Sequence, residues 1–385
     1  MLTDQHLLRI PGPSPIPPSV QQAMNGTMIG HRGKETKELL QRILPRLKPI
    51  FGTKQDVIPI AGSGTAGLEM AVTNAAKPGD HVLVIVTGAF GDRFTKICNA
   101  YNLHVNRIDV PWGEPIDPSY IESYLQDHPE ISVVFATFCE TSTGVLNPIQ
   151  ALGKVIHHKS NALLVVDGVS CVAGVETKMD EWRVDILVTG SQKAFMLPAG
   201  LMFISASERA WEVIENNPQQ RFYLDMRTYK KSLADTSTPF TPALSLLFGL
   251  DQVLNLIDQE GLSNVFRRHL LVRDMTREAF KALDIPLLTT DESASPTVTA
   301  VQPSDFNSEE LRQTLKSHFN LSLAGGQQHL KGKIFRIGHM GYCSPADTLQ
   351  TISLIEIGLQ LIGKNIELGQ GTAAAQQIYI QQEVR

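Results

Sequence analysis

Lys193 and Asp167 are the residues whose chemical types and positions suggest catalysis most directly. Lys193 follows the apolar run 186–188 after a short polar turn, and Asp167 closes the apolar run 162–166. Such runs predict buried strands, and open α/β sheets bind ligands at the carboxyl ends of their strands. An amine and a carboxylate at that edge are the groups a pyridoxal phosphate enzyme requires, one for a Schiff base and one to hold the pyridinium proton. Alone, Lys193 could be a solvated lysine and Asp167 a helix cap.

Residues 62–67, Gly-Ser-Gly-Thr-Ala-Gly, form a glycine-rich turn between a predicted strand and a predicted helix. The spacing matches the dinucleotide-binding fingerprint, but that fold needs an acidic residue at the end of the next strand, and none ends the apolar run 81–86. A dehydrogenase is therefore disfavoured. Backbone N–H groups and the hydroxyls of Ser63 and Thr65 at a helix N-terminus instead predict a site for one phosphate group. A plain strand-to-helix turn is the alternative.

Two further strand ends carry polar or aromatic groups. Phe90 lies between small residues after the run 81–86, where its ring can lie against a planar ligand, although a core position is the alternative. The stretch 140–144, Glu-Thr-Ser-Thr-Gly, places hydroxyls after the strand-like segment 132–137. We therefore expect several strand ends to converge on one site.

Composition excludes several classes of protein. The 385 residues include 42% hydrophobic residues, and 34 basic against 39 acidic residues give a net charge of -5, so no broad positive surface for nucleic acid or anionic membrane is expected. No apolar run approaches the roughly 20 residues of a membrane span, and the N-terminus lacks a signal-peptide pattern. Four scattered cysteines without a C-x-x-C pair predict neither disulfides nor a metal site, and fit a cytoplasmic protein.

Helix-like and strand-like runs alternate from residue 35 to about 265. This alternation predicts an α/β fold with a mostly parallel sheet between helices. A helical pattern over 242–283, broken near Gly261, leads into a smaller α+β domain. We predict an extended proline-rich arm (1–18), a large cofactor-binding domain (19–265), a small C-terminal domain (266–365) and a polar tail (366–385).

Taken together, these motifs resemble the class V pyridoxal phosphate-dependent aminotransferases of fold type I. The likeness is strongest to alanine:glyoxylate and serine:glyoxylate aminotransferases, a group that also includes proteins labelled as the small subunit of a soluble hydrogenase. It covers nearly the whole chain except the tail. The matching segments, in chain order, are 12–15, 28–31, 62–67, 88–91, 140–144, 166–170, 189–194 and 335–342.

The resemblance implies pyridoxal 5'-phosphate as cofactor, bound by Lys193 as a Schiff base, with Asp167 at the pyridine nitrogen. It implies that Arg336 binds the substrate carboxylate through its planar fork and that Gly30 borders this pocket. The other implied cofactor contacts are Phe90 on the ring face, Thr141 near the phenolic oxygen, Ser63, Gly64, Thr65 and Gln192 at the phosphate, and Thr238 and Thr241 at the phosphate of the neighbouring subunit in a homodimer.

Three positions depart from the animal alanine:glyoxylate enzymes. Thr65 stands where a histidine is usual, Phe90 where a tryptophan is usual, and Thr238 where a tyrosine is usual. Each substitution offers the cofactor a smaller or weaker contact while leaving the reaction type intact.

The implied activity is transfer of the amino group of a small amino acid, alanine or serine, to glyoxylate, which gives glycine and a 2-oxo acid. Two other class V activities are alternatives: 2-aminoethylphosphonate transamination, and cysteine desulfuration, for which Cys343 is the only cysteine near the proposed site. A non-catalytic subunit of a larger assembly is a third alternative.

Overall fold

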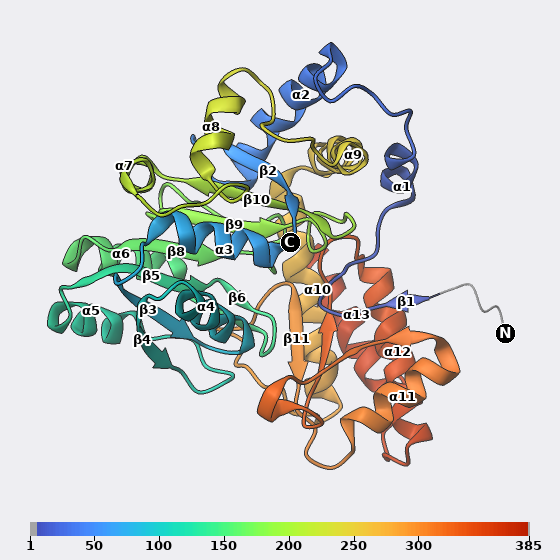
Figure 1. Cartoon of the computed structure of the whole chain (residues 1–385). Coiled ribbons are helices and arrows are strands. Elements are labelled where there is room, and N and C mark those ends of the chain that lie inside the picture. Colours follow the sequence, from blue (N-terminus) through green and yellow to red (C-terminus); the bar gives the residue numbers. More distant parts are fainter. Residues whose placement is uncertain (1–5, 384–385) are drawn as a thin grey trace.

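A seven-stranded sheet forms the centre of the protein, whose computed structural model describes residues 6–383 (Figure 1). All strands of this sheet run parallel except β10, which is antiparallel to both of its neighbours. The prediction of an α/β fold with a mostly parallel sheet is confirmed. In order across the sheet, the strands are β2 (Val57–Gly62), β10 (Gly200–Ala206), β9 (Ile186–Gly190), β8 (Leu163–Asp167), β5 (Ile131–Thr137), β3 (His81–Val86) and β4 (His104–Asp109).

The inner strands are buried on both faces, which is why they are nearly continuous apolar runs. Alternate residues of β3 illustrate this: Val82, Val84 and Val86 join one hydrophobic core, while Leu83 and Ile85 join another on the opposite face. Helices cover both faces. The first core packs against α3 (Gly64–Ala75), α4 (Ala89–Ala100), α7 (Glu208–Asn216) and α8 (Met226–Ala234), and the second against α2 (Lys34–Phe51), α5 (Pro118–Asp127), α6 (Ile149–Lys159) and α9 (Leu244–Glu260).

A second, smaller group of elements lies below the main sheet in Figure 1. Its antiparallel sheet has the order β11 (Val298–Val301), β14 (Phe335–Gly338) and β13 (Ala324–Gly325). Phe280, Phe335 and Ile355 contribute to its own apolar core. The helices of this group are α10 (Leu262–Ala282), α11 (Ser308–Phe319), α12 (Pro345–Leu361) and α13 (Gln370–Glu383).

Helices α9 and α10 meet at Gly261, whose φ of +83° favours glycine, so the predicted break in the long helical pattern is confirmed. We predicted the boundary between the large and the small domain at residue 265, which lies within α10. That boundary stays a prediction. Near the N-terminus, α1 (Pro18–Met24) packs on α9 and β1 (Leu7–Leu8) pairs with β12 (Leu321–Ser322). Residues 1–5 of the predicted arm and 384–385 of the predicted tail lie outside the described residues.

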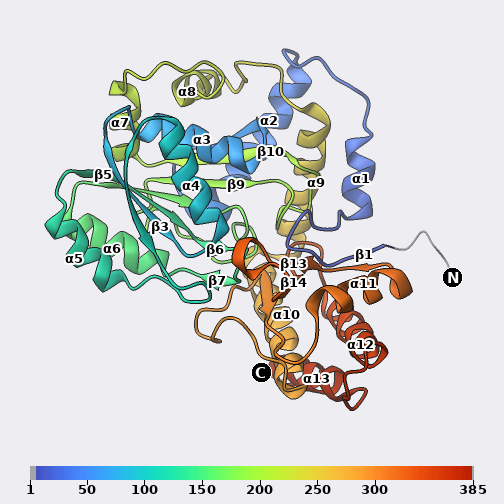
Figure 2. The same cartoon turned by 60° about the horizontal axis from the view of Figure 1, so that its bottom comes forward.

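The predicted polar tail forms α13, which lies beside α10 and α12 (Figure 2). Ala375 is fully buried against these helices. The buried carboxylate of Glu356 on α12 accepts bonds from the backbone N–H and the hydroxyl at the start of α13, at Gly371 (2.7 Å) and Thr372 (2.7 Å). Packing and this cap hold a polar segment in place.

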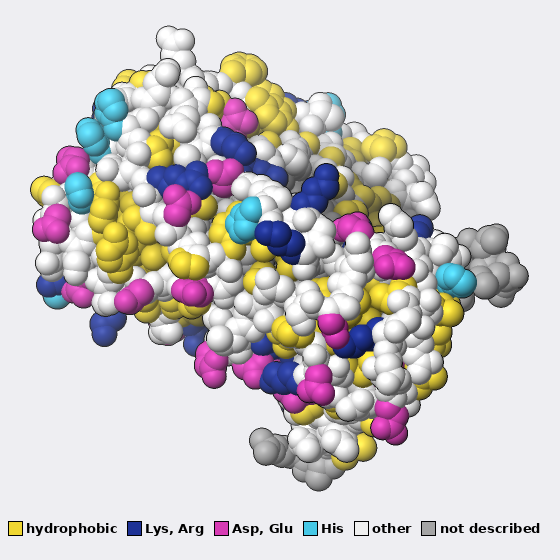
Figure 3. Space-filling view, turned by 90° about the horizontal axis from the view of Figure 1, so that it is seen from below, with side chains coloured by type: hydrophobic (Ala, Val, Ile, Leu, Met, Phe, Trp, Pro, Cys, Tyr) yellow, Lys and Arg dark blue, Asp and Glu magenta, His cyan; other side chains and the backbone are white. Residues whose placement is uncertain are grey.

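The underside of the molecule gives no sign of one dominant charge (Figure 3). Basic and acidic side chains are interspersed over the underside of the molecule (Figure 3). Between residues 6 and 383, no helix has both the length and the apolar character needed to cross a membrane, and no cluster of three or more metal-ligating side chains occurs.

Candidate active site

The carboxyl ends of five parallel strands of the main sheet lie at the same edge, with the antiparallel β10 between two of them. This edge carries the glycine-rich turn after β2, Phe90 after β3, the 140–144 stretch after β5, Asp167 at the end of β8 and Lys193 after β9. The strands are parallel, so their carboxyl ends point the same way, and residues far apart in sequence become neighbours there.

Lys193 is buried beneath the proline-rich arm, with 8% of its surface exposed. Its Nζ donates a hydrogen bond to the carbonyl of Pro11, and Ser14 Oγ donates to the Lys193 carbonyl (2.7 Å). Gly12, at φ +89°, lies so close that a Cβ there would come within 2.5 Å of Lys193 Cδ. A glycine at this position therefore lets the arm cover the amine.

Burial lowers the pKa of Lys193 to about 8, and the positive charge of Arg336 contributes in the same direction. Asp167 opposes this shift with its negative charge. An ordinary lysine is almost fully protonated at neutral pH. Lys193 can therefore supply a neutral amine, the form that acts as nucleophile or base, far more readily than a surface lysine.

Asp167 is a buried carboxyl group with little compensation from the protein. One oxygen accepts a bond from the Val169 backbone N–H (2.9 Å), and no basic side chain lies within ion-pairing distance among the residues that the structure describes. Burial raises its pKa to about 6, and the negative charge of Glu140 adds to the shift. A positively charged ligand atom placed beside Asp167 would restore its ordinary preference for the ionised form.

The glycine-rich turn offers donors to an anion. Ser63 caps α3 by accepting from the Ala66 N–H (3.2 Å), and the first N–H groups of a helix, here those of Gly64 and Thr65, have no partner within the helix. The side chain of Gln192 lies beside this turn, and its Oε1 is buried without a hydrogen-bond partner. A bound phosphate would accept hydrogen bonds from the free N–H groups of the turn, whereas Gln192 Oε1 is itself an acceptor and needs a donor.

Arg336 projects from β14 of the small sheet toward the edge of the large one. Its Nη1 donates to the carbonyl of Thr141 (2.8 Å), and its Nε and Nη2 both donate to the carbonyl of Gly325 (3.0 and 2.8 Å). A guanidinium has five N–H donors, so one donor on each of Nη1 and Nη2 remains for a ligand. Burial lowers the pKa of Arg336 to about 10, which leaves it positively charged at neutral pH.

Comparison with known proteins identifies the family. The family model for aminotransferase class V matches residues 8–343. The chain belongs to the class V aminotransferases. Its fold is that of the pyridoxal phosphate-dependent transferases, and the cofactor of this family is pyridoxal phosphate.

Individual relatives of this class V aminotransferase carry different names. It is 40% identical to the small subunit of a soluble hydrogenase from Synechococcus sp., over 98% of this chain and 99% of that one. It is 34% identical to serine–glyoxylate aminotransferase of Arabidopsis thaliana, over 99% and 96% of the two chains. The solved structure of alanine–glyoxylate aminotransferase from Nostoc sp. superposes with a TM-score of 0.89, at 31% identity, over 93% and 96% of the chains.

The residues at this class V site fit pyridoxal phosphate. The N–H groups of Gly64 and Thr65 at the start of α3 have no partner within the helix and lie where an anion can be held. Asp167 has no positively charged partner among the described residues. A protonated ring nitrogen can supply that positive charge. Lys193 is a buried amine with a lowered pKa. The site therefore offers one group to each part of the cofactor: the start of α3 for the phosphate, Asp167 for the ring nitrogen and Lys193 for the Schiff base.

Three predicted residues form a separate group in this aminotransferase chain. Thr238 and Thr241 belong to the loop before α9, and Gly30 to the loop before α2. Arg32 joins the two loops by donating to the carbonyl of Thr238 (3.0 Å). No hydrogen bond or ion pair of the described chain connects these loops to Lys193, and their place in the site stays a prediction.

Sequence reasoning missed two residues at this edge. Glu140 is fully buried, and its carboxylate accepts from the backbone N–H groups of Phe90 (3.0 Å) and Gly91 (3.1 Å) and from Ser142 Oγ (2.6 Å). Arg93 lies over the Phe90 ring, 4.6 Å from its centroid. Glu140 belongs to a motif that the sequence had singled out, beside the row of hydroxyls, whereas Arg93 lies just outside the motif 88–91, one helical turn after the aromatic residue.

Cys343, the candidate for desulfuration, is 4% exposed, and burial raises the pKa of its thiol. Arg268 holds the same segment by donating to the carbonyls of Gly341 and Cys343 (both 2.8 Å). A desulfurase needs an accessible thiolate on a mobile loop, and this thiol has neither property.

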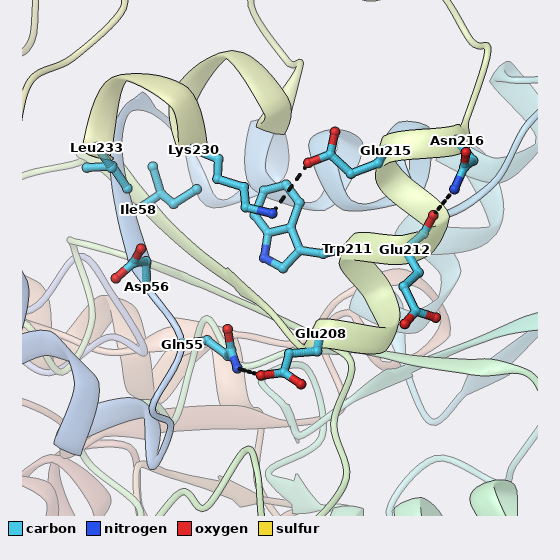
Figure 4. A pocket seen from close by; sticks show the side chains of 10 residues that line it. All are labelled: Gln55, Asp56, Ile58, Glu208, Trp211, Glu212, Glu215, Asn216, Lys230 and Leu233. Carbon is cyan, nitrogen blue, oxygen red and sulfur yellow. Dashed lines mark hydrogen bonds and ion pairs between the residues drawn. The ribbon is translucent and has the colours of Figure 1, made fainter. Parts of the chain in front are cut away.

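An open groove of about 520 Å³ lies at the opposite edge of the sheet, beside the start of β2 and the end of β10 (Figure 4). Lys230 Nζ sits 4.1 Å from the centre of the Trp211 ring and pairs with Glu215 (3.4 Å). The Lys230–Glu215 pair is about half exposed to solvent, in contrast to the buried charged groups at the carboxyl edge.

Proposed function

We propose that this class V aminotransferase transfers the amino group of alanine or serine to glyoxylate. The observation that supports this most is the convergence of a buried amine of lowered pKa, a buried carboxyl group and a guanidinium with two free donors at one sheet edge. Relatives named for serine–glyoxylate and alanine–glyoxylate transamination support the choice of substrates.

In this proposal, pyridoxal phosphate supplies an electron-accepting ring that stabilises negative charge on the substrate Cα. Arg336 binds the carboxylate of the amino acid with its two remaining donors and so fixes the orientation of Cα. Lys193, once its amine is free, removes the Cα proton. Asp167 keeps a proton on the ring nitrogen. In the return half-reaction, Lys193 delivers a proton to the Cα that becomes that of glycine.

The remaining predicted contacts belong to the same proposal. Phe90 would cover one face of the ring, and Thr141 would lie near its phenolic oxygen. Ser63, Gly64, Thr65 and Gln192 hold the phosphate. Thr238 and Thr241, with Gly30 at the substrate pocket, act in the site of a homodimer. The four unpaired, buried cysteines agree with a cytoplasmic location.

The test is spectroscopic. The purified protein should show the yellow absorbance of lysine-bound cofactor, and alanine or serine should bleach it to the pyridoxamine form faster than aspartate, cysteine or 2-aminoethylphosphonate. Glyoxylate should then restore the colour and release glycine. A protein that stays colourless after incubation with pyridoxal phosphate would refute the proposed function.

A matched pair of variants tests the role of the amine. Lys193→Ala should reduce transamination at least about 1,000-fold, since it removes the group that moves the proton. Lys230→Ala makes the same chemical change in the groove at the opposite edge (Figure 4) and should leave the rate unchanged. Near-normal turnover by Lys193→Ala would exclude our assignment.

A further inference from the structure

Arg93 connects Phe90 with the glycine-rich turn. It lies on α4, one helical turn after Phe90, and its guanidinium lies 4.6 Å from the centre of the Phe90 ring. Its Nη1 donates a hydrogen bond to Thr65 Oγ1 (3.1 Å), in the first turn of α3. One side chain therefore contacts both the aromatic residue and the glycine-rich turn.

Arg93 is also unusual in its lack of a counter-charge. Within residues 6–383, every half-buried or buried arginine has a carboxylate within 4.0 Å except Arg93 and Arg336. Leaving a partly buried cation unpaired is unfavourable. The two exceptions lie at the same sheet edge. This indicates that a bound ligand supplies the negative charge that pairs with each of them.

The charge of the cofactor phosphate calls for such a cation. A phosphate monoester carries between one and two negative charges near neutral pH. The turn provides only neutral donors from Ser63, Thr65 and Gln192, together with the start of α3. Arg93 adds a full positive charge, and it also adds to the electrostatic field at Asp167 and Lys193. Charge-assisted hydrogen bonds to phosphate are stronger than neutral ones.

We propose that Arg93 binds the phosphate group of pyridoxal phosphate, beside the Thr65 hydroxyl, while its guanidinium plane packs on Phe90. This inference rests on the phosphate position assigned under the proposed function. The other anion that could reach an arginine here is the distal carboxylate of a dicarboxylic amino donor. The contact with Thr65 favours the phosphate, since Thr65 belongs to the helix start that offers free N–H groups.

Two cofactor forms separate these possibilities. Apoenzyme of Arg93→Gln should bind pyridoxal phosphate about 10- to 100-fold more weakly than wild type, while its affinity for pyridoxal, which lacks the phosphate, should change less than about threefold. Inorganic phosphate should raise the melting temperature of the wild-type apoenzyme and not that of the variant. Arg107→Gln is the matched control, because Arg107 pairs with Asp92 and Asp109 instead, and it should retain wild-type affinities.

Three results would overturn the proposal. Equal weakening of both cofactor forms would mean that Arg93 acts only through Phe90. Unchanged cofactor affinity with a raised KM for aspartate would assign Arg93 to the substrate. Unchanged binding of all ligands would leave Arg93 no role in the site. If Arg93→Gln fails to fold, Arg93→Lys, which keeps the charge and loses the fork, should show an intermediate loss for pyridoxal phosphate alone. A wild-type apoenzyme unable to bind pyridoxal phosphate would instead refute the proposed function.

Discussion

Two buried aspartates in the same sheet have opposite environments. Asp167 ends β8 at the carboxyl edge, and Asp185 directly precedes the neighbouring strand β9 at the other edge. They are similarly hidden, with exposures of 3% and 1%. Burial raises the pKa of Asp167 to about 6. Burial also acts to raise the pKa of Asp185, but hydrogen bonds from His157 and Arg209 outweigh it and hold that pKa below its ordinary value.

The difference lies in the partners that each carboxylate finds. Asp185 accepts bonds from Arg209 (2.6 Å), from the Leu164 N–H (2.8 Å) and from Ser207 Oγ (2.8 Å). Asp167 accepts one bond from its own loop. At one edge the protein neutralises its buried charge and gains stability. At the other edge it leaves charge uncompensated, and a ligand can complete the arrangement.

The largest expected effect comes from breaking the satisfied cluster. Asp185→Asn removes the charge that pairs with Arg209 and should lower the free energy of unfolding by about 3 kcal/mol. Urea unfolding of the apoenzyme, followed by circular dichroism, measures this loss. The folded fraction should still bind pyridoxal phosphate with wild-type affinity. A loss below about 1 kcal/mol would show that the cluster is not the structural anchor that its hydrogen bonds indicate.

The same aspartate-to-asparagine substitution at the carboxyl edge should change the free energy of unfolding in the opposite direction. Because the pKa of Asp167 is raised from 3.8 to about 6, its carboxylate destabilises the apoenzyme at pH 7, and this penalty disappears as the pH falls through 6 toward 4. Asp167→Asn should therefore stabilise the apoenzyme by about 1–3 kcal/mol at pH 7 and by little at pH 4. Transamination should fall sharply in the same variant. Destabilisation at pH 7 would contradict the comparison.

The reactivity of Lys193 as a function of pH tests, without any mutation, whether groups at the carboxyl edge are left uncompensated. With a pKa of about 8, the rate constant for covalent attachment of pyridoxal phosphate to the apoenzyme should rise about tenfold per pH unit below pH 7 and about fivefold from pH 7 to pH 8. It should then rise only about twofold between pH 8 and 10. Nα-acetyl-lysine, measured over the same range, is the control and should continue to rise. A profile parallel to that of the control would show that burial does not shift this amine.

The sequence was sufficient to predict the strand ends on which the candidate site residues lie. Apolar runs bounded by glycine and polar residues marked β3, β8 and β9, and the residues directly after them predicted the positions of Asp167 and Lys193. Strand β10 was not predicted, nor was its antiparallel direction, which depends on pairing with β2 and β9. The edge strand β4 was also missed, because only one face is covered and its residues are mixed in polarity.

Residues that act through distant backbone groups could not be predicted. Besides the nearby Ser142, the partners of Glu140 are the N–H groups of Phe90 and Gly91, 50 and 49 residues earlier in the chain. The order of α13 likewise depends on Glu356, a residue of α12. Propensity and periodicity describe neighbours in sequence, whereas these contacts exist only after the sheet and helices have assembled.

Glu140 and Glu356 provide the smallest and most specific test. Each is a buried carboxylate that accepts backbone N–H groups at the start of a helix, but only Glu140 lies at the carboxyl edge. An amide keeps one acceptor oxygen, so Glu140→Gln and Glu356→Gln should each cost about 1–2 kcal/mol of unfolding free energy.

Only Glu140→Gln should also alter Asp167, because the negative charge of Glu140 helps to raise the pKa of that carboxyl group. The stability difference between Asp167 and Asp167→Asn, measured across pH in each background, reports that pKa. The pKa of Asp167 should fall below about 6 with Glu140→Gln and should stay at about 6 with Glu356→Gln. Identical pH profiles in both backgrounds would mean that Glu140 serves only to cap α4. A selective shift would mean that it also keeps Asp167 responsive to the ligand.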